Sequence, residues 1–88
     1  MALKKPMVAP NGAECEYHRV DMVELDVNTM RGSFVVGSYP AEQHARLTRA
    51  PAWTTRYDNV QATSTLTAHA EAYEVLKTLP EWNGAEDV

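Results

Sequence analysis

The sequence holds one cysteine, four isolated glycines and no long hydrophobic run. Cys15 cannot form a disulfide within the chain, nor can it supply the several thiolates of a cysteine-based zinc cluster. Because no two glycines lie close together, none of them builds a phosphate-binding loop. An internal disulfide framework and a nucleotide site of the phosphate-loop type are therefore excluded, and synthesis in a reducing compartment is expected.

Hydrophobic segments are also short. None approaches the roughly 20 residues that a membrane-spanning helix needs. Residues 1–10, MALKKPMVAP, include two lysines but no continuous apolar stretch of signal-peptide length. We therefore expect a soluble protein without a membrane partner, which stays in the cytoplasm unless it leaves the cell inside a larger assembly.

The length and net charge of the chain limit its stability and the partners that it can bind. A chain of 88 residues forms one domain and buries only about 60 to 65 per cent of its unfolded surface, so its stability margin is thin and a partner is favoured. The net charge of −4 disfavours binding to the phosphate backbone of a nucleic acid. An exception would need Arg46, Arg49 and Arg56 to gather into a local basic patch.

The segment 15–39 contains the two longest runs of strand-like alternation, and it predicts a β-hairpin. Apolar or aromatic residues recur at odd positions and would share one face, with polar residues on the other. The odd set is Cys15, Tyr17, Val23, Leu25 and Val27, and the even set is Glu16, His18, Glu24 and Asp26. Val20 and Met22 are apolar residues at even positions, which are otherwise polar in this segment, and this change indicates a β-bulge around 19–22.

Three further segments carry local signals. Residues 28–32, NTMRG, predict the hairpin turn, with Gly32 free to adopt a positive φ. Residues 53–60 alternate and predict a third strand. Residues 68–79 predict a helix that ends before Pro80, whereas 41–49 fit either a short helix or a surface loop. The apolar stripe of the longer helix is Ala68, Ala72, Val75, Leu76 and Leu79, with Tyr73 at its flank and His69 facing water in the first turn.

These elements predict an α+β fold, in which a three-stranded antiparallel β meander carries one C-terminal α-helix packed on one face. Residues 13–82 would form the single small domain. Residues 1–12, which include Pro6 and Pro10, would form an extended N-terminal arm, and residues 83–88 a flexible acidic tail.

Candidate catalytic groups do not form a recognisable set. His18, His44 and His69 are too far apart in sequence to make a local metal-ligand pair, and His18 is expected on a solvated strand face. Cys15 would need a nearby base to act as a nucleophile, so a structural thiol is favoured. We therefore predict that the protein is not an enzyme and has no catalytic, metal or cofactor-binding residue. The rival interpretation is a minor hydrolase built on histidine and carboxylate side chains.

The aromatic residues of the predicted strands could stack on a base or a sugar, but a sheet core or a protein interface is the better interpretation. If the bulge turns Val20 and Met22 outward, these two residues together with Phe34 and Val36 would form an apolar interaction surface. The expected occupant is a protein, either a second copy of the chain or another protein.

Four segments of the chain are similar to small bacteriophage and prophage proteins. They are the opening MALKKPMVAPNG, the run 17–20, the pair 38–39 and, most specifically, the closing run AYEVLKTLPEWNGAEDV at 72–88. Proteins of this kind are typically encoded among tail and virion structural genes. The resemblance implies a virion structural or assembly component, made in the bacterial host cytoplasm and present there or in the virion. The alternative that it leaves open is a small phage-encoded module that binds a host regulator or nucleic acid.

Overall fold

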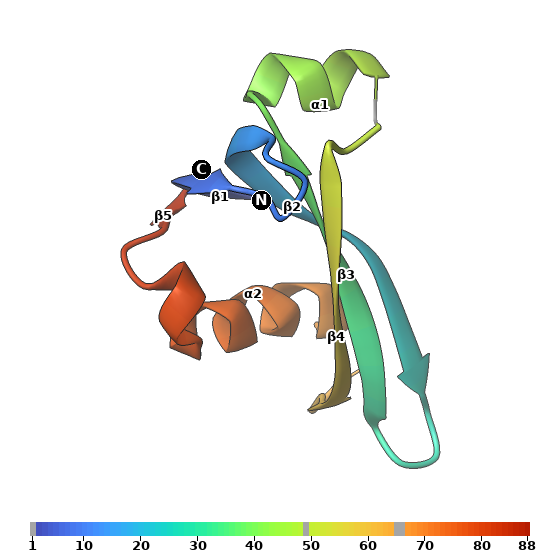
Figure 1. The fold of residues 1–88 in the computed structure, drawn as a ribbon. Coiled ribbons are helices and arrows are strands. Elements are labelled where there is room, and N and C mark those ends of the chain that lie inside the picture. The colour runs from blue at the N-terminus through green and yellow to red at the C-terminus, as the bar shows by residue number, and fades with distance from the viewer. Residues whose placement is uncertain (1, 49, 65–66) are drawn as a thin grey trace.

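The computed structural model describes residues 2–48, 50–64 and 67–88. Within these residues the chain forms a five-stranded antiparallel sheet with the order β4-β3-β2-β1-β5. The strands are β1 (Leu3–Val8), β2 (Glu14–Asp26), β3 (Arg31–Tyr39), β4 (Trp53–Gln61) and β5 (Glu86–Asp87). The helices are α1 (Glu42–Thr48), α2 (Ala68–Thr78) and the 3-10 turn η1 (Pro80–Trp82). Figure 1 shows α2 against one face of the sheet and α1 over the ends of β3 and β4 that lie far from the hairpin tip.

The predicted three-stranded meander with one helix is wrong, because both ends of the chain add a strand and a second helix is present. Segment 1–12, expected as an arm, contains β1, and segment 83–88, expected as a tail, contains β5. Leu3 of β1 lies opposite His18 of β2 on one side and Asp87 of β5 on the other. Neither strand has a local signal, since a proline interrupts β1 and β5 has only two residues.

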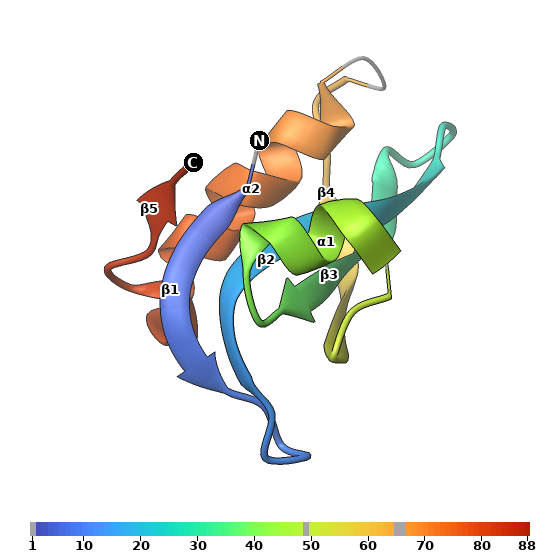
Figure 2. The same cartoon turned by 90° about the horizontal axis from the view of Figure 1, so that it is seen from above.

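Specific contacts hold the two ends of the chain in the sheet. Ala2 and Val88 exchange backbone hydrogen bonds of 3.1 and 3.0 Å. The ammonium of Lys77 on α2 donates to the Asp87 carboxylate at 2.9 Å. The β1–β2 register shifts between Lys4 and Met7, and this irregularity accommodates Pro6, which has no N–H for the ladder. Figure 2 shows β1 running between β2 and β5 beside α2.

The predicted hairpin is confirmed as β2 and β3, and the predicted bulge lies within it. Val20 is opposite Val36, whereas Met22 is opposite Val35, so β2 advances two residues while β3 advances one. Asp21 is therefore the additional residue of the bulge. The positive φ of the turn belongs to Met30, at 57°, and not to Gly32. Gly32 lies within β3, where a Cβ atom would collide with the carbonyl oxygen of Glu24.

The core lies between the sheet and α2. It comprises Leu3, Val20, Phe34 and Val36 of the sheet with Ala72, Tyr73, Leu76 and Trp82 of α2 and η1. The predicted helix is confirmed over 68–78, but Tyr73 is fully buried instead of flanking the stripe. Its hydroxyl oxygen accepts a hydrogen bond of 2.8 Å from the Val20 N–H, directly beside the bulge. The helix thus satisfies a main-chain donor where the β-ladder is interrupted.

The two remaining predicted elements are also present. β4 covers the predicted third strand, with Trp53, Thr55 and Tyr57 half-buried between exposed residues. Segment 41–49 forms α1, the helical alternative, as far as Thr48. Ala45 of α1 is fully buried against the sheet end, but Leu47 of the same helix is 84% exposed. A seven-residue helix offers only a narrow buried face, so one of its two apolar side chains points to solvent.

Candidate functional site

The structure brings the predicted interaction residues into different environments. Val20 and Phe34 are each 3% exposed and Val36 is fully buried, so these three residues belong to the core. Met22 alone is exposed, at 45%. The apolar surface expected from Val20, Met22, Phe34 and Val36 is therefore wrong.

The bulge explains this error. Before it, the even-numbered residues are buried, Val20 in the core with α2 and His18 against Trp82 of η1. After it, the odd-numbered residue Val23 takes the position against the core. Side chains alternate between the two faces of a strand, so one additional residue moves the buried positions from even-numbered to odd-numbered residues. The same reversal places His18 on the buried face, although we expected it to be solvated.

His18 is part of the interior scaffold. Its Nε2 donates to the Lys5 carbonyl oxygen at 2.8 Å, and its Nδ1 accepts from the Ser38 hydroxyl at 2.9 Å. The ring packs edge-on against Trp82 with centroids 4.8 Å apart. Burial lowers the pKa of His18, an effect that outweighs the hydrogen bond to Lys5. Both ring nitrogens are thus engaged in hydrogen bonds inside the protein, so neither is free to act as a general base.

The other titratable candidates also have structural roles. His69 lies in the first turn of α2, as predicted, and its Nε2 donates to the Val20 carbonyl oxygen at 3.0 Å. Cys15 is 4% exposed, and burial raises the pKa of its thiol, which disfavours the reactive thiolate. Among the residues that the structure describes, no group of three histidine, cysteine, aspartate or glutamate side chains is arranged to hold a metal ion.

A polar cluster occupies the bulge on the sheet face opposite α2. The Asp21 carboxylate accepts from Arg19 Nε and from the Tyr39 hydroxyl, both at 2.6 Å, and Arg19 Nη2 donates to the same hydroxyl at 2.9 Å. Gly37 leaves the room that the Asp21 side chain fills. Burial, with the neighbouring Asp21, raises the pKa of Tyr39 to about 12. We call Arg19, Asp21 and Tyr39 the bulge cluster; its Tyr39 phenol stays neutral at physiological pH.

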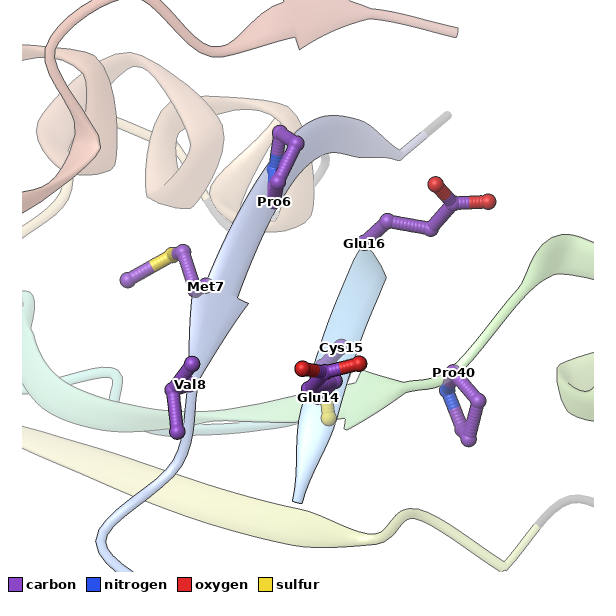
Figure 3. Close-up of a pocket in the computed structure, with 7 residues that line it drawn as sticks. All are labelled: Pro6, Met7, Val8, Glu14, Cys15, Glu16 and Pro40. Carbon is purple, nitrogen blue, oxygen red and sulfur yellow. The ribbon is translucent and has the colours of Figure 1, made fainter. Parts of the chain in front are cut away.

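Two grooves flank the ends of β1 and β4. One, of about 590 Å³, lies between β1 and β2, and Figure 3 shows Met7 and Val8 on one side with Cys15, Glu16 and Pro40 on the other. The second, of about 520 Å³, runs under β4 and has an aromatic wall formed by Trp53, Tyr57 and Trp82. We call this second cavity the β4 groove.

The wall of the β4 groove is rigidly built. Tyr57 stacks on Phe34 with ring centroids 5.2 Å apart. Its hydroxyl accepts from Trp82 Nε1 at 2.8 Å and donates to the Glu81 carboxylate at 3.3 Å. These contacts fix β4 to η1, and the polar atoms of the wall are bonded to one another. The groove therefore offers apolar surface and shape more than free polar groups.

Within the part of the chain that the structure describes, β4 is the last strand of the sheet, so no strand pairs with the main-chain groups of its outer edge. The Ser38 carbonyl accepts from the Ala52 N–H at 2.9 Å, so it faces β4. Main-chain groups alternate between the two sides of a strand. The main-chain groups of Val36 and Phe34 therefore also point toward β4, and those of their partners Thr55 and Tyr57 point toward β3. The main-chain groups of Thr54, Arg56 and Asp58 consequently point away from the sheet.

The exposed side chains of this edge are charged and of opposite sign. Arg56 donates from Nε to Asp58 at 2.8 Å, and from Nη2 to the Ser33 hydroxyl at 2.8 Å and to Glu24 at 3.4 Å. The hydrogen bond and charge of Asp58 raise the pKa of Arg56. The sequence showed the alternation of β4 but not that this strand would be an edge. The sequence signal for an exposed strand was the triplet Arg56-Tyr57-Asp58, which places two opposite charges on one strand face.

The arrangement provides a strand edge, an aromatic groove and no assembled catalytic group among the residues described. Comparison with protein-family models, curated proteins and solved structures found no match. Within the described residues, no helix is long and apolar enough to cross a membrane. The free edge of β4 with the groove beneath it is the candidate functional site.

Proposed function

We propose that this chain is a non-enzymatic phage or prophage protein that acts through protein contacts, as a virion structural or assembly component of the tail module made in the host cytoplasm. The observation that carries the contact role is the free edge of β4, nine residues long, above the β4 groove. The phage assignment depends on the resemblance of the four sequence segments, of which the closing run 72–88 is the most specific.

The two edges of the sheet differ in a way that supports β4 as the contact strand. The opposite edge is β5, which has two residues and follows directly from η1. β4 contains neither proline nor lysine, the residues that most often protect an edge from pairing. An extended segment of a partner protein can therefore add to β4 by main-chain hydrogen bonds, and its side chains can enter the groove.

The charge distribution supports a protein partner over a nucleic acid. Arg46 is paired with Glu42 at 2.6 Å, Arg19 with Asp21, and Arg56 with Asp58. Arg49, the third member of the basic patch considered from sequence, lies outside the described residues. Arginines already neutralised by carboxylates of their own chain gain little from phosphate contacts.

The test uses the purified chain and the purified products of the genes that flank its own gene. We expect the wild-type chain to bind either a second copy of itself, by sedimentation equilibrium, or one of these proteins, by isothermal titration calorimetry. Thr54→Pro should abolish that binding while circular dichroism stays unchanged. The physical reason is that proline removes an outward N–H of the edge, where the fold itself does not use it. Thr54→Ala is the matched control and should bind normally.

Two outcomes would overturn the proposal. One is full partner binding by Thr54→Pro, since the edge would then not be the contact. The other is salt-sensitive binding to unrelated duplex DNA with no binding to any flanking product, which would favour the nucleic-acid alternative.

A further inference from the structure

We propose that the partner of the β4 edge is a second copy of this chain, paired antiparallel about a two-fold axis at Tyr57, with Arg56 opposite Asp58 of the partner subunit. This inference rests on the proposed function, because it names the partner of the same edge. A two-fold contact of identical strands joins the two sheets into one continuous sheet.

Hydrogen-bonding direction restricts the register. Before the β4 bulge, Thr54, Arg56 and Asp58 present outward main-chain groups, so hydrogen bonds between two copies need these residues opposite one another. Three two-fold registers pair Arg56 in this way. They place Arg56 opposite the partner's Thr54, opposite the partner's Arg56 or opposite the partner's Asp58.

Charge selects among the three registers. Arg56 opposite the partner's Arg56 sets like charges against each other, which destabilises a strand pair. Arg56 opposite the partner's Asp58 gives two symmetric pairs of opposite charge on one sheet face. Among the residues described, Arg56 Nη1 and the second carboxylate oxygen of Asp58 have no hydrogen-bond partner, so both are available for this contact.

Length and packing select the same register. With Tyr57 on the axis, both Arg56–Asp58 pairs lie inside the two strands, on either side of the axis. The register with Thr54 opposite Arg56 would leave Asp58 beyond the start of the partner's strand. Tyr57 is already fixed by its stack on Phe34, so bringing two such rings together needs little further ordering.

The bulge in β4 limits the strength of the dimer. The β3–β4 register shifts between Gly32 and Phe34, where Asn59 adopts a φ of 57°. Beyond this point the main chain no longer follows the alternation, so the regular ladder is confined to the residues around Tyr57. We therefore expect a dimer that forms and dissociates with concentration and weakens with added salt.

Charge exchange tests the pairing. Sedimentation equilibrium of the wild-type chain should show a monomer–dimer equilibrium between micromolar and submillimolar concentration. Asp58→Arg and Arg56→Asp should each raise the dissociation constant by about tenfold or more, since like charges then face each other. The double variant Arg56→Asp with Asp58→Arg should restore dimerisation, and an equimolar mixture of the two single variants should form a heterodimer.

Cysteine cross-linking tests the register in a Cys15→Ser background. Residues on the two-fold axis lie opposite themselves, so Tyr57→Cys should form an intermolecular disulfide under mild oxidation. Thr55→Cys and Arg56→Cys are the matched controls, because each would lie on the axis of one of the other two registers. A dominant cross-link through position 55 or 56 would overturn the proposed register.

The outcomes separate this inference from the proposed function. A wild-type chain that stays monomeric throughout the concentration range rejects the second copy. If that monomer still binds a flanking gene product in a manner abolished by Thr54→Pro, the contact role stands with a foreign partner. If Thr54→Pro has no effect on any binding, both proposals fail.

Discussion

The sheet face that α2 covers is apolar, whereas the opposite face carries charged clusters. On the α2 face, Leu76 and Val36 are fully buried in a continuous core. On the opposite face, the bulge cluster joins β2 to β3, and the contacts of Arg56 reach from the edge strand β4 to Ser33 of β3 and Glu24 of β2, with α1 over one end of the sheet. The two faces come from the same strands, so alternation alone separates them. The buried apolar contacts that stabilise the fold are therefore concentrated on one face, and the other face, with the β4 edge, is the surface that we propose for contacts.

The largest expected effect comes from shortening a side chain on the covered face. Leu76→Ala should lower the free energy of unfolding by about 2 to 4 kcal/mol, because it leaves a cavity in the core. Val35→Ala on the opposite face, where the side chain is only half-buried, should cost about 1 kcal/mol. Urea denaturation of both variants measures the contrast. Equal losses would show that the two faces contribute alike and that α2 is not the main cover.

The bulge cluster should give an intermediate effect. Asp21→Ala removes the carboxylate that Arg19 and Tyr39 share, and we expect a loss of about 1 to 2 kcal/mol because both partners are left without their acceptor. Tyr39→Phe keeps the Arg19–Asp21 pair and should cost less. Urea denaturation again provides the measurement. If Asp21→Ala is as stable as the wild type, the cluster does not stabilise the bulge.

The smallest effect concerns His18, a polar group on the apolar face. Because burial lowers its pKa in the folded state, the fold favours the neutral ring, while the unfolded ring protonates near about 6.5. The contribution of the neutral His18 ring to stability is therefore fully present above the pKa of the unfolded state. It is lost as the pH falls from that pKa towards the lower pKa of the folded state. The free energy of unfolding should fall between pH 7.5 and pH 5.5. His18→Gln should flatten this dependence, and an unchanged slope in that variant would contradict the assignment to His18.

Local signals in the sequence were sufficient for elements whose pattern is complete within a short segment. The alternation of β2, β3 and β4 and the helical spacing of α2 each repeat over several residues, and the structure has all four elements. The phase change at Val20 and Met22 located the bulge correctly. The edge role of β4 had no such signal, since an edge is defined by which strands lie elsewhere.

Period and phase are local properties, so the sequence was sufficient to predict a β-hairpin with a bulge, a third strand and a covering helix. The addition of β1 and β5 to the sheet depends on tertiary contacts, since their pairing joins segments from opposite ends of the chain. The tertiary structure also decided which side of the bulge faces the core, moving Val20 and His18 inward and leaving Met22 outside. The physical reason is that one additional residue reverses the alternation of a strand, and the buried parity is then set by where α2 packs.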